Sequence, residues 1–403
     1  MNNQSILVEK IPSYWVVKKI KYVFDERKET NDPIQTDVLV SLTHDRGVIL
    51  HSEKGDIGNK EKDDIKKYKI VHPGDIVINS MNVIIGSSGL SDHFGLVSPV
   101  YYTLVKKDPD YDNRFFHYLF RSTIFQKSLI GVGNGILEHR MRVPMDKLGS
   151  HFIPLPSSNE QKLISRYLDK KTSQIDSLVQ KIQKKVELLK EQRTSLINHY
   201  VTKGLDPNVE MKDSGVEWIG QIPKHWDLIK LKYLFSLEGG KDPKLVEIDD
   251  GKYPIFGTGG EISRSSDFLY DKPTLLLGRK GTIDKPFVVT EPFWVSDVMY
   301  FTVQKTEITP DYLLKLFNLV PFGFYKYGST QPSMSRIDYE NMIFPIPSEE
   351  ERQFITKFLD RELIKFETLI EKQNSKSSLL KEYRQSLISS VVTGKVRVTE
   401  DMI

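Results

Sequence analysis

The sequence contains no cysteine, which excludes disulfide bonds, thiolate metal sites and a cysteine nucleophile. It also has no apolar run near the roughly 18–20 residues that a membrane-spanning helix needs. Glu9 and Lys10 stand where a secretory signal would carry its apolar stretch. These absences lead us to expect a cytoplasmic protein in a reducing compartment.

The charges are nearly balanced, with a formal net charge of +3. The isoelectric point is about 8.5, whereas dedicated nucleic-acid-binding domains usually exceed about 9. Composition alone therefore decides no function. The 403 residues, 39% hydrophobic and 28% charged, indicate a folded chain with two or more cores, because one domain usually holds roughly 100–200 residues.

The motifs of common catalytic sites are missing. The sequence has no phosphate-binding loop, no H-E-x-x-H zinc motif, no G-x-S-x-G elbow and no Asn/Asp-Pro-Pro-aromatic loop. The nine histidines show no metal-ligand spacing, and Asp75 has no Glu-x-Lys partner nearby of the nuclease type. We therefore expect no catalytic residue and no metal site.

The chain does contain a long internal repeat. The segments that begin at Pro154 and Pro345 match without a gap for more than forty residues, reading PLPSSNEQKLISRYLDKK and PIPSEEERQFITKFLDRE. Upstream of each, Ile-Pro and a tryptophan (Trp15 and Trp226) precede KKIKYVF and IKLKYLF. The repeat predicts a tandem duplication of a globular region and a helix, with boundaries at 1–153, 154–203, 204–344 and 345–403.

Seven-residue periodicity predicts that the repeated segments are long helices. The two series are Leu168, Ile175, Ile182, Leu189 and Leu196, then Leu359, Phe366, Gln373, Leu380 and Leu387. Sustained heptads with charged flanks favour a coiled coil. Intermediate positions are filled by Leu178, Val186 and Tyr200 in the first series and by Leu369 in the second. Acidic residues follow each Pro-Ser start, and a glycine follows each Val-Thr end. We expect helices from about 159 to 201 and from about 350 to 392, packed antiparallel. The alternative is that each helix packs on its own globular region.

The globular regions show strand patterns punctuated by glycine and proline. Strand-like runs include 75–78 and 100–104 in the first region, then 274–277 and 298–303 in the second. Helices are expected at 113–128 and 310–319. The predicted fold class is α/β (α+β): two small mixed domains, each with a twisted, largely antiparallel sheet and each followed by a long helix.

Loops rich in glycine, hydroxyl, amide and basic residues occur at corresponding places in both regions. Glycine lets a backbone come close, Ser and Thr hold phosphates, and Arg, Asn and Gln can read base edges. Any one such loop could equally be an ordinary exposed turn. The candidate DNA-binding residues are Asn79, Ser80, Asn82, Ser87, Asn134, His139, Arg140 and Arg142, then Thr258, Arg279, Lys280, Thr282, Ser329, Thr330, Gln331 and Arg336.

Several segments together resemble the specificity subunits of type I restriction–modification systems, over essentially the whole chain. They are FIPLPSSNEQ, FPIPSEEERQ, RTSLINHYVTKGLDP, RQSLISSVVTGKV and VEMKDSGVEWIGQIPKHWDLIKLKYLF. YPIFGTGG, LLLGRKGTIDK and FWVSDVMYFTV also resemble a target-recognition domain of this family. The corresponding part of the first region, INSMNVIIGSSGLSD, matches only loosely.

The resemblance implies two target-recognition domains that each read half of an asymmetric, bipartite site in double-stranded DNA. The helices would set the gap between the halves and dock two methyltransferase (modification) subunits, and motor-nuclease (restriction) subunits would join them. S-adenosylmethionine, ATP and magnesium would belong to those partners, whereas this chain would hold no cofactor and no catalytic site. The alternatives are a self-contained DNA methyltransferase or nuclease, and a coiled-coil scaffold that does not bind DNA.

Overall fold

The computed structural model describes residues 5–8, 11–43, 46–54, 64–133, 142–325 and 332–403. The chain divides into two compact units. The first unit combines Met1–Gln183 with Ser375–Ile403, and the second is Lys184–Asn374. In the described ranges, no helix is long and apolar enough to cross a membrane.

The first unit is built on a four-stranded antiparallel sheet. In order across the sheet, its strands are β2 (Phe24–Glu26), β9 (Tyr101–Lys106), β6 (Ile76–Asn79) and β7 (Ser88–Leu90). Apolar residues of α3 (Asn113–Arg121) and α4 (Thr123–Ser128) join the core of this unit. The predicted single helix 113–128 is thus two helices. Ser122 interrupts it with extended backbone, and its side chain accepts the N–H of Phe125 to cap α4.

Shorter elements complete the first unit. Strand β1 pairs with β10, β3 with β4, and β5 with β8, all antiparallel. These elements are α1 (Ser5–Val8), β1 (Val16–Lys19), α2 (Ile20–Val23), β3 (Val40–Thr43), β4 (Gly47–Leu50), β5 (Lys69–Val71), β8 (Gly95–Val97), α5 (Met145–Ser150) and β10 (Phe152–Leu155).

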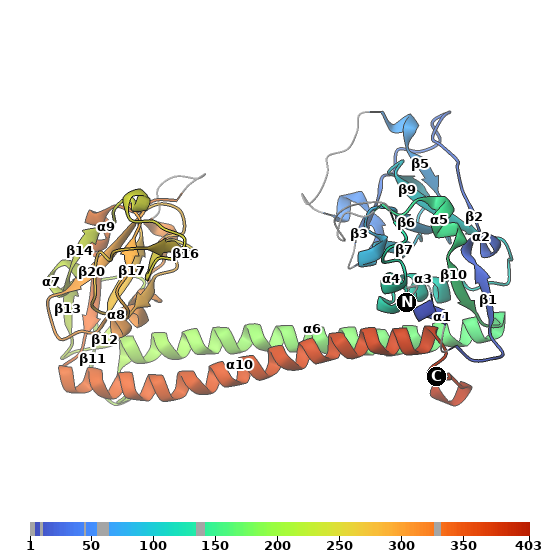
Figure 1. The fold of residues 1–403 in the computed structure, drawn as a ribbon. Helices are drawn as coiled ribbons and strands as arrows, with labels where there is room; N and C mark the ends of the chain where they lie inside the picture. The colour runs from blue at the N-terminus through green and yellow to red at the C-terminus, as the bar shows by residue number, and fades with distance from the viewer. Residues whose placement is uncertain (1–4, 9–10, 44–45, 55–63, 134–141, 326–331) are drawn as a thin grey trace. The chain divides into compact units, whose positions relative to one another are not determined.

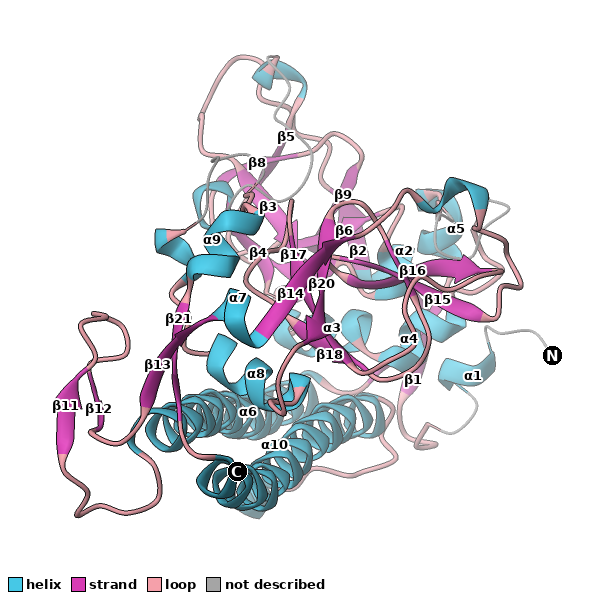
Figure 2. Cartoon of the chain, turned by 90° about the vertical axis from the view of Figure 1, so that its left-hand side faces the viewer, coloured by secondary structure: helices cyan, strands magenta, loops and turns pink. Residues whose placement is uncertain are grey.

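The second unit repeats the same sheet order, and Figure 2 labels the four strands of its main sheet. Its strands are β14 (Phe235–Gly239), β20 (Met299–Gln304), β17 (Thr274–Gly278) and β18 (Phe287–Val289). A second sheet places β15 (Tyr253–Gly257) between β16 (Gly260–Ser265) and β19 (Trp294–Val295). The pair β15–β19 is parallel, and the other named strand pairs of the described residues are antiparallel. The remaining elements are β11 (Met211–Asp213), β12 (Gln221–Pro223), β13 (Asp227–Lys230), α7 (Leu231–Leu234), α8 (Pro310–Phe317), α9 (Arg336–Asn341) and β21 (Ile343–Ile346).

Two long helices, α6 (Ser158–Lys203) and α10 (Glu349–Val392), each contribute to both units (Figure 1). In the second unit Arg193 lies 4.0 Å from Glu367, and the rings of Tyr200 and Phe358 meet edge to face at 4.5 Å. Residue numbers rise along α6 as those of its partners fall along α10, so the helices run antiparallel there. In the first unit Arg384 of α10 pairs with an aspartate of α6. The predicted helix bounds and antiparallel packing are confirmed.

The buried stripe of α6 differs from the predicted seam in one respect. The heptad residues Leu168 and Ile182 are buried, as expected. The stripe also contains Val186, one of the residues named at intermediate positions, and Val179, which was not named; each follows a heptad residue by four positions. Leu178, three positions after a heptad residue, is 48% exposed. Leu369 in the other helix is 44% exposed. These two leucines, each three positions after a heptad residue, therefore lie outside the buried stripe. An α-helix advances 3.6 residues per turn, and this stripe follows the step of four residues.

Each long helix ends against the Pro-x-x-Trp motif of its own unit. Gly204 and Gly394 end the helices with positive φ angles of 74° and 71°, the left-handed conformation expected of a glycine cap. A Cβ built on Gly394 would lie 2.4 Å from Pro12 and 3.2 Å from Trp15. A Cβ on Gly204 would lie 3.3 Å from Trp226. In each unit, the glycine at the end of the long helix therefore packs against the Pro-x-x-Trp motif. This contact joins the helix to the globular part of that unit.

Candidate nucleic-acid interface

The third strand of each main sheet, β6 in the first unit and β17 in the second, leads into a loop. The same backbone hydrogen bond holds this loop in both units. The Val143 N–H donates to the Ser80 carbonyl at 2.9 Å, just after β6. The Met334 N–H donates to the Arg279 carbonyl at 3.0 Å, just after β17. Because β6 and β17 also occupy matching places in their sheets, Ser80 and Arg279 stand at equivalent positions of the duplicated fold.

In the second unit this loop gathers several of the predicted residues. Gly281 has a φ of 93°, and a Cβ on it would lie 3.2 Å from the Thr258 hydroxyl. The Gly281 N–H donates to the Pro332 carbonyl at 2.8 Å, and Lys280 forms a β-bridge with Ser333. The turn that follows β15, the loop that follows β17 and the segment before α9 therefore lie together.

The charged side chains of this edge differ in what they bind. Arg279 and Lys280 are exposed. Among the described residues, the Arg279 side chain donates only a long hydrogen bond of 3.3 Å, to the Asp297 carbonyl. Arg336 instead binds Glu340 one turn along α9, at 2.6 Å. The hydrogen bond to Glu340 is the main reason that the pKa of Arg336 is raised. Thr282 is half-buried. Arg279 and Lys280 are therefore the cations most available to a ligand.

The loop of the first unit presents fewer side chains. Ser80 is fully buried and donates its hydroxyl to the Val100 carbonyl at 3.1 Å. Ser87 is also buried. Asn79 and Asn82 are half-exposed, and the Asn79 side chain accepts the Met81 N–H. Burial leaves the Ser80 and Ser87 hydroxyls little access to DNA, so the two asparagines are the side chains that this loop offers.

Arg142 of the first unit is exposed and directly precedes Val143, which holds the loop. Six other predicted residues lie outside the described residues: Asn134, His139, Arg140, Ser329, Thr330 and Gln331. The described part of the chain contains no group of three or more His, Cys, Asp or Glu residues that could hold a metal ion.

Sequence reasoning missed a basic cavity of the first unit, which includes Arg121 and Lys381. Arg121 lies on a short amphipathic helix and Lys381 on a charged face of a long one. Neither position carries a motif. The pairing of these two segments, which lie far apart in the chain, is what reveals the cavity.

Comparison with known proteins identifies the family. The model of the type I restriction modification DNA specificity domain matches residues 12–188 and 223–379, one match per repeat. The putative type I restriction enzyme MjaX specificity subunit of Methanocaldococcus jannaschii is 22% identical over 97% of this chain and 96% of its own length. The MjaVIII specificity subunit of the same organism is 25% identical over 61% of this chain, a match that spans 62% of that relative.

Solved structures show the same fold. A chain solved in work on complex assembly and conformational transition of the type I R-M system aligns with a TM-score of 0.75, at 13% identity, over 96% of this chain and 100% of its own. The HsdS subunit from Thermoanaerobacter tengcongensis aligns with a TM-score of 0.53, at 14% identity, over 96% of this chain and 98% of its own. The resemblance drawn from the sequence is confirmed, and the chain belongs to the DNA-binding family of type I restriction–modification specificity subunits.

Proposed function

We propose that this chain reads an asymmetric, bipartite site in double-stranded DNA, with one half read by each globular region. The observation that carries the proposal is the equivalence of Ser80 and Arg279, two positions held by the same backbone hydrogen bond in two copies of one sheet. A duplicated scaffold suits a duplex site with two halves. The side chains differ between the copies, a buried serine in one and an exposed arginine in the other, so the two halves would differ in sequence.

The long helices would set the gap between the half-sites. A continuous α-helix rises by about 1.5 Å per residue and is stiff over this length. In the first unit Asp169 of α6 accepts hydrogen bonds from Tyr118 and Arg114 of α3, at 2.8 and 2.9 Å. In the second unit Asp360 of α10 pairs with Lys315 of α8 at 3.0 Å. These matching joints attach each recognition domain to a helix, which favours a fixed spacing.

The same helices carry exposed apolar side chains suited to docking partner subunits. Single exposed apolar residues are common, but neighbouring ones, such as Leu379 and Tyr383 one helical turn apart, favour an interface. In the first unit they are Leu178, Leu379 and Tyr383, and in the second they are Leu188, Phe354 and Ile364, between 48 and 64% exposed. We propose that each set docks one methyltransferase subunit and that motor-nuclease subunits join this assembly.

The chain would supply recognition and no catalytic group. S-adenosylmethionine, ATP and magnesium would bind to the partner subunits. Because the proposed substrate is DNA, we expect the complex to act in the cytoplasm. A self-contained methyltransferase would transfer methyl groups from S-adenosylmethionine without a partner, and a scaffold would leave no sequence-specific footprint on DNA.

Methylome mapping with single variants tests the proposal. The full chain, wild type or variant, is expressed with its methyltransferase partner in a host that lacks other adenine methylation. Arg279→Ala should relax one base position in one half-site, at a cost of about 1–3 kcal/mol if the side chain is bidentate to a base. Arg142→Ala should affect the other half-site only. Loss of sequence preference in both halves from either variant would contradict one-domain, one-half reading.

A further inference from the structure

A basic cavity lies in the first unit where α3 meets the long helices. Its volume is about 780 Å³. The side chains that set its chemistry come from four separate segments of the chain: Arg46, His117, Arg121, Asp176, Lys381 and Arg384. Among the described residues of this lining, four arginines and lysines stand against one carboxylate, Asp176, which gives the described lining an excess of positive charge.

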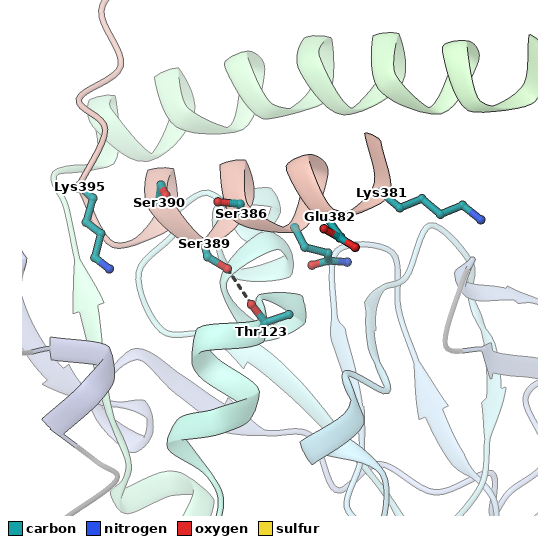
Figure 3. A pocket seen from close by; sticks show the side chains of 8 residues that line it. Thr123, Lys381, Glu382, Ser386, Ser389, Ser390 and Lys395 are labelled. Atoms are coloured by element: carbon teal, nitrogen blue, oxygen red, sulfur yellow. Dashed lines mark hydrogen bonds between the residues drawn. The ribbon is translucent and has the colours of Figure 1, made fainter. Parts of the chain in front are cut away.

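Among the described residues that line the cavity, the one carboxylate has a cation partner, and Lys381 has none. Asp176 is committed to Arg384, with a distance of 2.9 Å between Nε and Oδ1. Arg46 donates to the backbone carbonyl of Glu53 rather than to a carboxylate. Lys381 is exposed and has no carboxylate partner among the described residues. Figure 3 shows a neighbouring pocket of the same unit, which Lys381 also lines and in which Ser389 of α10 bonds to Thr123 of α4.

His117 adds a hydrogen-bond donor without adding charge. Burial, helped by the nearby Arg121 and Arg384, lowers the pKa of His117 to about 3. The ring is therefore neutral near pH 7. Its Nδ1 accepts the Leu90 N–H at 3.1 Å, which assigns the ring proton to Nε2. The cavity thus combines cations with a neutral donor, a set that suits an anionic oxygen ligand.

The equivalent region of the second unit, where α8 meets the long helices, lacks some of the polar side chains that line this cavity. Asp169 and Asp360 occupy equivalent positions of the helix repeat, and they bind Tyr118 of α3 and Lys315 of α8. These two contacts align α8 with α3. On that alignment Leu314 stands at the position of His117, and Asn318 at the position of Arg121. Two of the polar groups that define the cavity are therefore absent from the second copy.

The helix repeat changes the charges of that region further. Lys190 and Arg193 match Lys381 and Arg384, but Glu367 and Glu371 match Asp176 and Gln180. This region thus has two cations and two carboxylates by sequence, and Arg193 lies 4.0 Å from Glu367. The duplicated region is basic in the first unit only, so its charge does not follow from the fold the two units share.

The cavity is continuous with the candidate recognition loop of the first unit. Gly86, at the turn of that loop, lines the cavity and has a φ of 83°. Arg121 donates to the carbonyl of Ser88 in β7 at 3.0 Å. A DNA duplex that contacts Asn79 and Asn82 would therefore continue toward Arg121 and Lys381.

We propose that this cavity binds backbone phosphates of the DNA beside the half-site read by the first unit. The inference rests on the proposed function. Lys381 and Arg121 supply charge to the phosphates, and the contact carries no base information. The second half of the site has no matching clamp, so the DNA is held more strongly at one end of the gap.

Salt-dependent DNA binding by the full chain, assembled with its methyltransferase partner, tests the proposal. Two duplexes are compared, one with the target site and one without. Lys381→Gln should lower the affinity for both by the same factor, about fivefold at physiological salt, and reduce the salt slope by about 0.9. Lys381→Arg should restore both quantities. Lys190→Gln, at the equivalent position of the second unit, is the matched control and should leave both unchanged.

The outcomes separate this inference from the proposed function. If the wild-type complex shows no preference for the target duplex, the proposed function fails. If it shows that preference but Lys381→Gln keeps the wild-type slope, only the phosphate cavity is wrong. Gel filtration reports the assembly state. If Lys381→Gln weakens binding only by losing the methyltransferase subunit, the cavity serves a partner carboxylate and the proposal is overturned.

Discussion

The indole N–H of Trp226 donates a hydrogen bond to Oε2 of Glu351 at 2.9 Å. The same carboxylate also lies 2.9 Å from His225. In the first unit the equivalent carboxylate, Glu160, instead accepts a long hydrogen bond of 3.4 Å from Tyr14. The indole nitrogen of Trp15 is buried without a partner among the described residues. The contact between the tryptophan and the start of the long helix is therefore duplicated in sequence. Only in the second unit does the indole N–H bind the helix carboxylate.

Glu351→Ala should destabilise the second unit by about 1–3 kcal/mol, because it leaves the buried indole N–H of Trp226 unsatisfied. Hydrogen exchange of second-unit peptides under native conditions measures this change. Glu160→Ala is the matched control in the first unit. It loses only the contact with exposed Tyr14 and should change stability by less than about 0.5 kcal/mol. Equal effects from the two variants would mean that the hydrogen bond to Trp226 adds nothing.

Gly394→Ala should destabilise the first unit by more than backbone strain alone. The residue has a φ of 71°, and a Cβ would approach Pro12 to 2.4 Å. The left-handed conformation costs about 1–2 kcal/mol for alanine, and the clash must be relieved by moving the helix end. Gly215→Ala is the control, since it has a φ of 68° but no atom within 4 Å of its Cβ. Chemical denaturation of both variants should show the larger loss for Gly394→Ala.

Acid should destabilise the first unit. Burial lowers the pKa of His117 to about 3 and that of His151 to about 4. Below about pH 6.5 the unfolded chain binds these protons and the folded chain does not, so stability present above pH 6.5 falls as pH drops toward 3–4. Linkage gives a loss of about 2 kcal/mol per histidine at pH 5.

The variant His117→Gln isolates one of these contributions. The amide oxygen of glutamine can still accept the Leu90 N–H that His117 binds, but it does not titrate. Urea denaturation at pH 7 and pH 5 should therefore show a smaller pH effect in the variant. An unchanged difference between the two pH values would rule out His117 as the titrating group.

Leu168→Ala and Leu178→Ala should have opposite consequences. Leu168 is fully buried, and its truncation should cost about 2–5 kcal/mol of unfolding free energy. Leu178 is 48% exposed, so its truncation should barely change stability and should weaken methyltransferase docking instead. Thermal denaturation and sedimentation of the assembled complex measure the two effects. A large loss of stability from Leu178→Ala would mean that Leu178 belongs to the buried stripe after all.

The sequence by itself determined the duplication, the two long helices and their ends. These features depend on local rules: heptad spacing, acidic first turns, and a glycine such as Gly394 that takes the left-handed cap. The helix bounds were therefore predicted within one or two residues. The family could be predicted from the same repeated segments, because their amino-acid sequences together are specific to it along the whole chain.

Only the tertiary structure decided which side chains are accessible and which distant segments meet. Ser80 looked like a phosphate ligand, yet packing buries it and turns its hydroxyl to the Val100 carbonyl. Leu178 fills an intermediate position of the heptad series, yet it lies outside the buried stripe of the helix. Arg121 and Lys381 line one cavity although a whole domain separates them in the chain. Burial and long-range contact are properties of packed elements, and no local periodicity encodes which elements will pack together.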